Sequence, residues 1–492
     1  MARINTNIAS LVAQNNLSRS NAQLRTSLER LSTGLRINRG ADDPAGLVVS
    51  ERLRSEIAGI SKAIGNSERA SSVIATTEAY LMEVSDLLNS IKGLVVEAAN
   101  TGGMSQEEID ANQLQIDSAI DSITRISNTA SFAGLQLLNG SLEYITSGVP
   151  TSAVTGVDVF GVQFGNATTR AVTTEVIASA QTAELFLSGN TAGAPGELLS
   201  SVTIEIAGNI GVQTVSFVSG TNLSAVVAAV NTLKESTGVS AALVSATNQT
   251  SGLTFNSTAY GSEQFVSVQK FGNGGDFFSV HESQGGNQVQ RDEGRDVSAI
   301  INGALATGRG TSVSLNTPAL SIELLLDETY AQTLNSTKTF EITGGGATFQ
   351  LGPSVNTTQQ IGFGVRSVAA SRLGSTIING TSFQLSSVRK GGAYSLQSGG
   401  LENTEKILHK SIDEIAVMRG RLGAFERNTI QTNVRSLQVG LENITMSESQ
   451  IRDTDFAFET AQLTRSQILV QAGTSVLATA NTTAQSVLAL LQ

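Results

Sequence analysis

Apolar residues at the two ends of the chain recur with helical spacing, whereas those in the middle alternate with polar residues. Near the N-terminus leucines occupy the a and d positions of a heptad: Leu17, Leu24, Leu28, Leu31 and Leu35. Near the C-terminus apolar residues fall at multiples of seven: Leu463, Val470, Leu477 and Leu491. This spacing predicts amphipathic helices in residues 1–140 and 401–492.

Local signals divide the N-terminal part into three helices. Gly40 is expected to end the first helix, and Asp43 and Pro44 suit the start of the second. Ser105 and Glu108 have the spacing of a capping box, in which each side chain satisfies the other residue's backbone N–H. We therefore expect a third helix that begins there and folds back on the second.

The middle of the chain predicts short strands separated by glycines. Alternating segments on both sides of residues 208–211 predict a hairpin, and Asn222 is expected to cap a short helix. Residues 200–270 as a whole predict a small α+β unit. Strands are expected within it at 239–245, 253–257 and 265–269, and beyond it at 321–326, 338–342, 348–351 and 361–365.

Together these patterns predict an α+β fold. Pairing the N- and C-terminal helices is the simplest way to bury both apolar seams, which gives an elongated, coiled-coil-like rod with a β-rich insert. Small residues between the C-terminal seam positions, such as Gly473 and Ala480, allow close approach but bury little area. Most such stripes are core contacts within a single bundle, but their position at both chain ends favours self-assembly.

Composition argues against several classes of protein. The 492 residues carry a formal charge of −11, opposite in sign to a typical nucleic-acid binder. Cysteine is absent, which excludes thiolate nucleophiles and cysteine-ligated metals, and the two histidines, His281 and His409, leave almost nothing for histidine-based catalysis or zinc binding. No cofactor, metal site or enzymatic activity is expected. No stretch is apolar enough to span a bilayer, and no cleaved signal peptide is expected.

Several segments resemble the terminal motifs of bacterial flagellins: residues 35–47, 132–140, 441–455 and 463–474. Residues 357–363 resemble the β-segment that returns to the rod in that family. The resemblance implies a filament subunit that serves motility. The terminal heptad residues named above would then mediate filament assembly. A hook–filament junction protein, which shares the terminal helices, is the alternative.

The resemblance also implies a domain arrangement. Residues 1–44 with 451–492 would form the inner core of the filament, and this part would order on polymerisation. Residues 45–170 with 345–450 would form the helical rod domain with its β-segment. Residues 171–344 would form the exposed outer domain.

The partners implied by the resemblance are further copies of the chain, the type III export apparatus with its chaperone, and the junction and cap proteins. The location would be the extracellular flagellum, with no membrane insertion. The family's Toll-like receptor segment aligns with Ser90, Leu94 and Gln115. Stimulatory members have arginine where this chain has Ser90 and glutamate where it has Gln115, so we expect weak receptor recognition.

Overall fold

The chain divides into two compact units of interleaved segments. The computed structural model describes residues 6–165, 167–189, 196–245, 248–272, 278–378, 380–398 and 400–489. Unit 1 comprises residues 1–72, 350–359 and 423–492, and unit 2 comprises residues 73–349 and 360–422. Helices from both chain ends pack together and the sheets come from the middle of the chain, so the predicted α+β class is confirmed.

Nine α-helices occur in the described residues: α1 (Ile8–Thr33), α2 (Pro44–Ala98), α3 (Gln106–Thr129), α4 (Leu223–Thr232), α5 (Lys234–Thr237), α6 (Glu328–Gln332), α7 (Leu401–Phe425), α8 (Gln431–Arg452) and α9 (Phe456–Ala489). A π-helical turn, Glu426–Ile430, joins α7 to α8 without a break in the helix. Short 3₁₀ turns lie at Gln249–Ser251, Thr357–Gln359, Leu385–Val388 and Leu396–Ser398.

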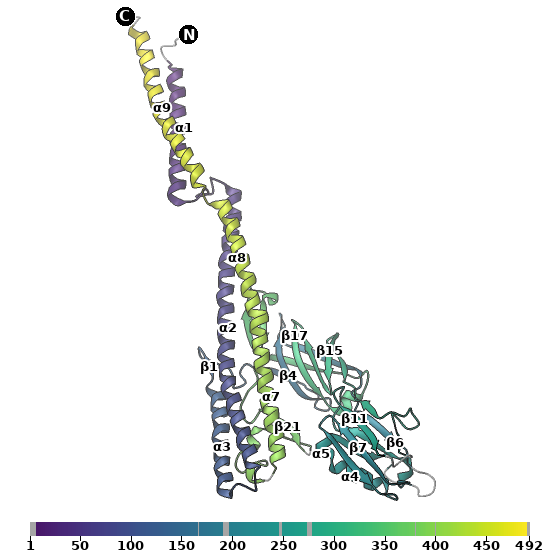
Figure 1. Cartoon of the computed structure of the whole chain (residues 1–492). Helices are drawn as coiled ribbons and strands as arrows, with labels where there is room; N and C mark the ends of the chain where they lie inside the picture. The colour runs from purple at the N-terminus through teal and green to yellow at the C-terminus, as the bar shows by residue number, and fades with distance from the viewer. Residues whose placement is uncertain are drawn as a thin grey trace. The chain divides into compact units, whose positions relative to one another are not determined.

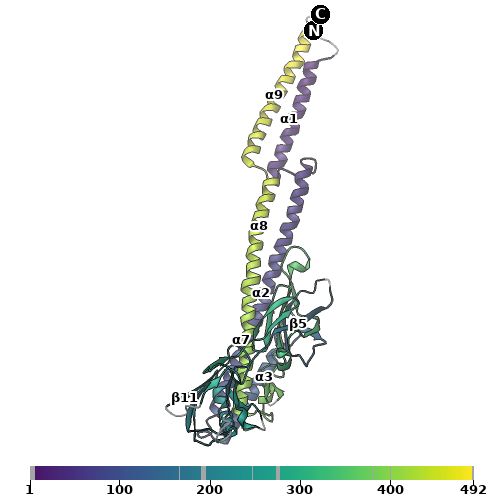
Figure 2. The same cartoon turned by 90° about the vertical axis from the view of Figure 1, so that its right-hand side faces the viewer.

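Unit 1 is built from paired helices. Helix α1 lies along α9, and the first part of α2 lies along α8, as both views show (Figures 1 and 2). The expected end of the first helix at Gly40 is wrong. Helix α1 ends at Thr33, because Gly34 adopts a left-handed conformation with φ 75° and donates its N–H to Arg30 O. Asp43 begins α2 as expected, since its carboxylate accepts the N–H of Gly46.

The helical part of unit 2 contains the rest of α2, α3 and most of α7. The predicted capping box is confirmed, because Ser105 and Glu108 each accept the other's backbone N–H. The buried Gln113 donates to Val388 O and accepts from Leu396 N, which ties the segment before α7 to α3. Fully buried isoleucines of α3 fill the core on its inner face: Ile116, Ile120 and Ile123.

The strands are β1 (Ser131–Phe132), β2 (Leu135–Gln136), β3 (Tyr144–Ser147), β4 (Val154–Val162), β5 (Arg170–Ala178), β6 (Glu184–Leu187), β7 (Val202–Gly208), β8 (Val212–Phe217), β9 (Val239–Leu243), β10 (Leu253–Ser257), β11 (Phe265–Phe271), β12 (Val280–His281), β13 (Arg291–Glu293), β14 (Ser298–Ile301), β15 (Ala304–Arg309), β16 (Ser312–Asn316), β17 (Leu320–Leu326), β18 (Thr337–Gly345), β19 (Ala347–Gln350), β20 (Gln360–Phe363), β21 (Thr376–Ile378) and β22 (Thr381–Phe383).

The strands form one large sheet and two smaller four-stranded sheets, besides three two-stranded pairs. The large sheet has the order β3-β18-β5-β14-β15-β16-β17-β4, and its recorded pairings are antiparallel. The sheets β12-β6-β10-β9 and β13-β11-β7-β8 share one core with α4, centred on side chains such as Phe255 and Ile204. We call this smaller body, residues 183–296, the small α/β body.

The strands expected from the sequence are present to within a few residues, including the hairpin of β7 and β8. The expected cap of α4 is only partly confirmed. Asn222 occupies the N-cap position, but its side chain makes no capping hydrogen bond. The backbone supplies a partner in its place, because the N–H of Leu223 donates to Gly196 O.

Candidate assembly surface on the terminal helices

Helices α1 and α9 run antiparallel, and polar side chains join the N-terminal end of α1 to the C-terminal part of α9. Asn7 donates from Nδ2 to Ala480 O over 2.9 Å, and Ser10 Oγ donates to Asn481 Oδ1 over 2.9 Å. Further along the pair, Gly473 faces Leu17, and a Cβ placed on Gly473 would lie 3.3 Å from Leu17 Cδ1. The small residue therefore allows the close helix approach that the sequence predicts.

The connection between α1 and α2 is hydrogen-bonded to the connection between α8 and α9, and we call this contact the clasp. Leu35 and Asp453 form an isolated antiparallel bridge. Arg36 N–H donates to Arg452 O over 2.7 Å, and Thr454 N–H donates to Gly34 O over 2.9 Å. Leu35 thus belongs to the clasp and not to a helix. The clasp fixes the register between the α1–α2 and α8–α9 connections.

The linker after the clasp is held by one carboxylate. Asp42 Oδ2 accepts the backbone N–H groups of Arg39 over 2.8 Å and Asn38 over 3.1 Å. The bond from Arg39 lowers the pKa of Asp42, and the bond from Asn38 and the charge of Arg30 act in the same direction. Asp42 therefore stays ionised and shapes the turn that leads into α2.

Polar side chains are buried between α1 and α9. The side chain of Glu459 is only 5% exposed, and its Oε2 lies 3.5 Å from Arg30 Nη1. Ser27 is also buried. The hydroxyl of Ser466 on α9 is buried without a hydrogen-bond partner among the described residues, and so is that of Thr454 in the clasp. The interface is therefore only partly apolar and only partly satisfied.

Most of the heptad residues predicted for assembly are half-buried in the single chain: Leu17, Leu24, Leu31, Leu35, Leu463, Val470 and Leu477. Leu28 is exposed, and Leu491 lies outside the described residues. Pairing α1 with α9 thus buries these heptad side chains only in part. The α1–α9 pair alone does not complete a hydrophobic core.

A second set of apolar side chains on these helices is exposed to solvent: Ile8, Leu11, Val12, Phe456, Phe458, Ile468, Leu469 and Val476. We call this set, together with Leu28, the uncovered apolar surface. Several large exposed apolar side chains on one pair of helices are typical of a surface that binds another protein. Phe456 lies seven residues before Leu463 and continues the predicted seam, whereas Ile468 and Val476 lie off that seam.

The three residues aligned with the receptor segment lie on helices of unit 2. Ser90 is exposed and Leu94 half-buried on α2, and Gln115 is exposed on α3. Their side chains are therefore at least partly accessible in the free chain.

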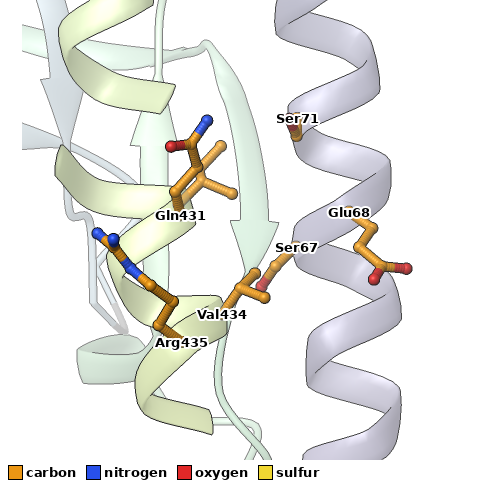
Figure 3. Close-up of a pocket in the computed structure, with 7 residues that line it drawn as sticks. Ser67, Glu68, Ser71, Gln431, Val434 and Arg435 are labelled. Carbon is orange, nitrogen blue, oxygen red and sulfur yellow. The ribbon is translucent and has the colours of Figure 1, made fainter. Parts of the chain in front are cut away.

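A groove of about 430 Å³ lies between α2 and the junction of the π turn with α8. Ser67 and Val434 face each other across it, while Glu68 and Arg435 point away from each other (Figure 3). Ser71 Oγ donates to Glu426 Oε1 over 2.6 Å, and Asn433 Nδ2 donates to Leu351 O over 2.7 Å. The polar groups beside the groove thus hold the π turn and the 350–359 segment to the helices.

Unit 2 contains a cluster of ionic groups where the large sheet meets α7, around a cavity of about 160 Å³. Arg366 Nη1 lies 3.0 Å from both carboxylate oxygens of Asp158. Arg421 lies 3.4 Å from the centroid of the Phe160 ring, and its Nη2 lies 2.7 Å from Glu323 Oε2. We call these groups, with Glu414, the ionic joint.

Two carboxyls of the ionic joint titrate abnormally. Burial raises the pKa of Asp158 above its ordinary 3.8, although Arg366 opposes the shift. Burial also raises the pKa of Glu414 above its ordinary 4.5, although the N–H of Gly374 donates to its Oε2 over 2.9 Å. The folded chain therefore holds these protons more tightly than the unfolded chain does, and both carboxyls lower its stability as the pH rises.

Replacing Glu414 with glutamine is expected to stabilise unit 2 at neutral pH. The amide is always neutral and can still accept from Gly374, so it avoids the burial of a charge. Its advantage over the wild type should grow as the pH rises above 4.5 and vanish below it. Chemical denaturation at a series of pH values measures this difference. The exposed Glu341→Gln is the control, and a pH-independent difference for Glu414→Gln would contradict the prediction.

Comparison with known proteins identifies the two chain ends. Residues 4–143 match the family model of the bacterial flagellin N-terminal helical region, and residues 406–491 match that of the C-terminal helical region. The chain is 29% identical to the B-type flagellin of Pseudomonas aeruginosa, with 99% of each chain covered. The chain belongs to the bacterial flagellin family. A flagellin is the structural subunit of the bacterial flagellar filament and not an enzyme.

Other flagellins give the same result over nearly the whole chain. The flagellin of Salmonella typhimurium is 28% identical, and flagellin A of Vibrio cholerae is 27% identical, with 99% of each chain covered in both cases. A solved flagellar cap protein of Escherichia coli has a TM-score of only 0.30 to this flagellin at 18% identity, covering 46% of this chain and 64% of that one. None of the helices that can be described is long and apolar enough to cross a membrane.

Proposed function

We propose that this flagellin polymerises through the uncovered apolar surface and the half-buried heptad residues of α1 and α9. The observation that carries this proposal is the incomplete core of the α1–α9 pair: large side chains such as Ile468 and Phe458 remain exposed in the single chain. Copies of the chain packed side by side would bury them. Burial of apolar surface is the main driving force of such association.

The domain arrangement follows from the same proposal. Residues 1–44 with 451–492 would line the centre of the filament, residues 45–170 with 345–450 would form the surrounding rod domain, and residues 171–344 would face outward. The clasp supports the first boundary, because Leu35 lies between α1 and α2 and Asp453 lies between α8 and α9. In the large sheet, β18 pairs with both β3 and β5, so the strand pairing continues across the proposed outer boundaries.

Seeded assembly of the purified chain tests the proposed polymer. Filaments are expected from the full-length chain and none from versions lacking residues 1–35 or 465–492, as read by negative-stain electron microscopy. The truncated versions should retain the circular dichroism of unit 2. Truncated chains that grow filaments as the full-length chain does would overturn the assignment to the terminal helices.

The other partners are inferred from the family. We expect export through the type III flagellar apparatus with a chaperone that binds the C-terminal helix, contact with junction and cap proteins at the filament ends, and an extracellular location. In the seeded assay a junction protein would bind hook ends without elongating.

Recognition by the animal Toll-like receptor for flagellin is expected to be weak. Loss of an interface arginine costs about 2 kcal/mol or more, which is about 30-fold in affinity. Serine occupies that position, so the concentration for half-maximal activation of reporter cells should be higher by about this factor. The Ser90→Arg variant should restore part of the potency, while Ser90→Gln should not. Wild-type potency equal to that of stimulatory flagellins would contradict the expectation.

A further inference from the structure

Strand β8 forms an edge of a four-stranded sheet in the small α/β body, and β7 is its one strand neighbour among the residues that the structure describes. It runs for six residues, Val212–Phe217, without a charged residue or a proline. Proteins usually protect such edges with charge, proline, shortness or a covering group, because an open edge pairs readily with another strand. An unprotected edge of this length therefore calls for an explanation.

The outer edge of β8 carries backbone groups that have no hydrogen-bond partner among the described residues. Gly208 N–H donates to Gly211 O over 3.0 Å, which fixes the alternation of the β7–β8 ladder. It follows that the N–H and C=O groups of Val212, Thr214 and Ser216 point away from β7. In the part of the chain that the structure describes, no backbone hydrogen bond joins them to another residue.

The other edges of the same body are protected. Asn231 bonds both the N–H and the C=O of Ala241 over 2.9 Å, and so occupies the outer edge of β9. Strand β13 consists of three charged residues, Arg291–Glu293, and β12 has only two residues. Among these edges β8 alone is long, uncharged and uncapped. The contrast indicates that this edge is used.

We propose that the outer edge of β8 pairs antiparallel with β8 of a second copy of this chain, centred on Thr214. In this register each copy contributes the outward N–H and C=O of Val212, Thr214 and Ser216, so Val212 faces Ser216 and the two threonines face each other. Polar threonine pairs and the absence of like charges favour this alignment.

The flanking residues support a second copy as the partner. Ile210 and Val218 precede and follow the strand, and their side chains are 62% and 71% exposed. In a pairing centred on Thr214, the turn that carries Ile210 of one copy lies near Val218 of the other, because both residues lie just beyond the paired segment. The same register thus completes the backbone pairing and covers two exposed apolar side chains, which a partner of unrelated sequence would do only by chance.

One pair of six-residue strands is a small contact for a protein interface, so the pairing should be weak between free chains. It uses a surface separate from the terminal helices and does not depend on filament growth. It would join the small α/β bodies of two copies.

Disulfide trapping of the unseeded full-length chain tests the pairing, because the native chain contains no cysteine. Residues facing each other at a hydrogen-bonded position have Cα atoms about 5.5 Å apart, within disulfide range. Thr214→Cys should form covalent dimers about tenfold faster than Gln269→Cys, which is also exposed and lies on the same face of this sheet. Equal rates would overturn the proposal.

The register is tested by mixing two variants. Val212→Cys mixed with Ser216→Cys should give mixed dimers in excess over either homodimer, because these positions face each other. Adding Thr214→Pro to both removes a donor at the edge without touching the β7 ladder and should abolish the excess. Thr214→Ala keeps the donor and should preserve it. An excess that survives Thr214→Pro would contradict the model, and seeded growth of the same variants separates this outcome from a failure of polymerisation.

Discussion

Replacing Ile468 with aspartate is expected to stop filament growth and leave the free chain folded. Ile468 has 63% of its surface exposed on α9, so the single chain loses no buried contact. In a filament that covers this position, the variant loses about 2 kcal/mol of apolar burial. It also buries an unpaired carboxylate, which costs several kcal/mol more. A total of about 5 kcal/mol raises the critical concentration by more than about a thousandfold.

Light scattering during seeded growth and electron microscopy of the products measure this effect. Ile468→Leu is the matched control, because it keeps the apolar side chain and should grow filaments. Circular dichroism and the denaturation midpoint of the aspartate variant should match those of the wild-type chain. Growth of the aspartate variant at the wild-type rate would show that this part of α9 remains exposed in the polymer.

The second large effect is expected from Arg421 in the ionic joint. Its guanidinium is stacked on Phe160 and bonded to Glu323, and both charged side chains are more than a third exposed. Arg421→Ala removes the stacking and leaves Glu323 without this partner, although Ser312 Oγ still donates to it over 3.2 Å. Because solvent screens the pair, we expect a loss of about 2 kcal/mol in the unfolding free energy of unit 2.

Denaturant unfolding of Arg421→Ala measures the loss, and Arg421→Lys should recover only part of it, since lysine lacks the planar fork. Arg435→Ala, on the exposed surface of α8, should change stability by less than about 0.5 kcal/mol. A double-mutant cycle with Glu323→Ala isolates the ion pair. If Arg421→Ala is as mild as Arg435→Ala, the ionic joint does not hold the sheet to α7.

The helical ends could be read from the sequence because their signals are local. The capping box at Ser105 and the heptad leucines depend on residues a few positions apart. The capping box is present, and Leu17, Leu24 and Leu31 lie half-buried on α1, whereas Leu28 is exposed. The end of α1 was misplaced, because two glycines compete for it. Gly34, and not Gly40, adopts the left-handed conformation that ends α1 at Thr33.

Other features could have been found from signals that were present. The dipeptide Asn302–Gly303 has φ of 50° and 83° and joins β14 to β15, and this pair is a strong hairpin signal. The spacing between successive apolar residues increases to five between Phe425 and Ile430, where the π turn adds a residue to the helix.

The buried polar contacts could not be predicted. Arg30 and Glu459 are far apart in the sequence, and their pairing depends on the register of α1 against α9. The same holds for Arg421 and Phe160, which meet only after a helix and a sheet have packed together. Periodicity shows which face of an element is buried but does not show which side chain of another element it meets.

The clasp has a consequence for the order in which the chain folds. Asn7 and Ala480 are separated by 473 residues, so joining them directly in an unfolded chain would cost about 5 kcal/mol of loop-closure entropy. Once α2 and α8 have paired, Arg36 and Arg452 are already neighbours and only short segments remain to be closed. Helices α1 and α9 should therefore pair last, beginning at the clasp, and they should separate first when the chain unfolds.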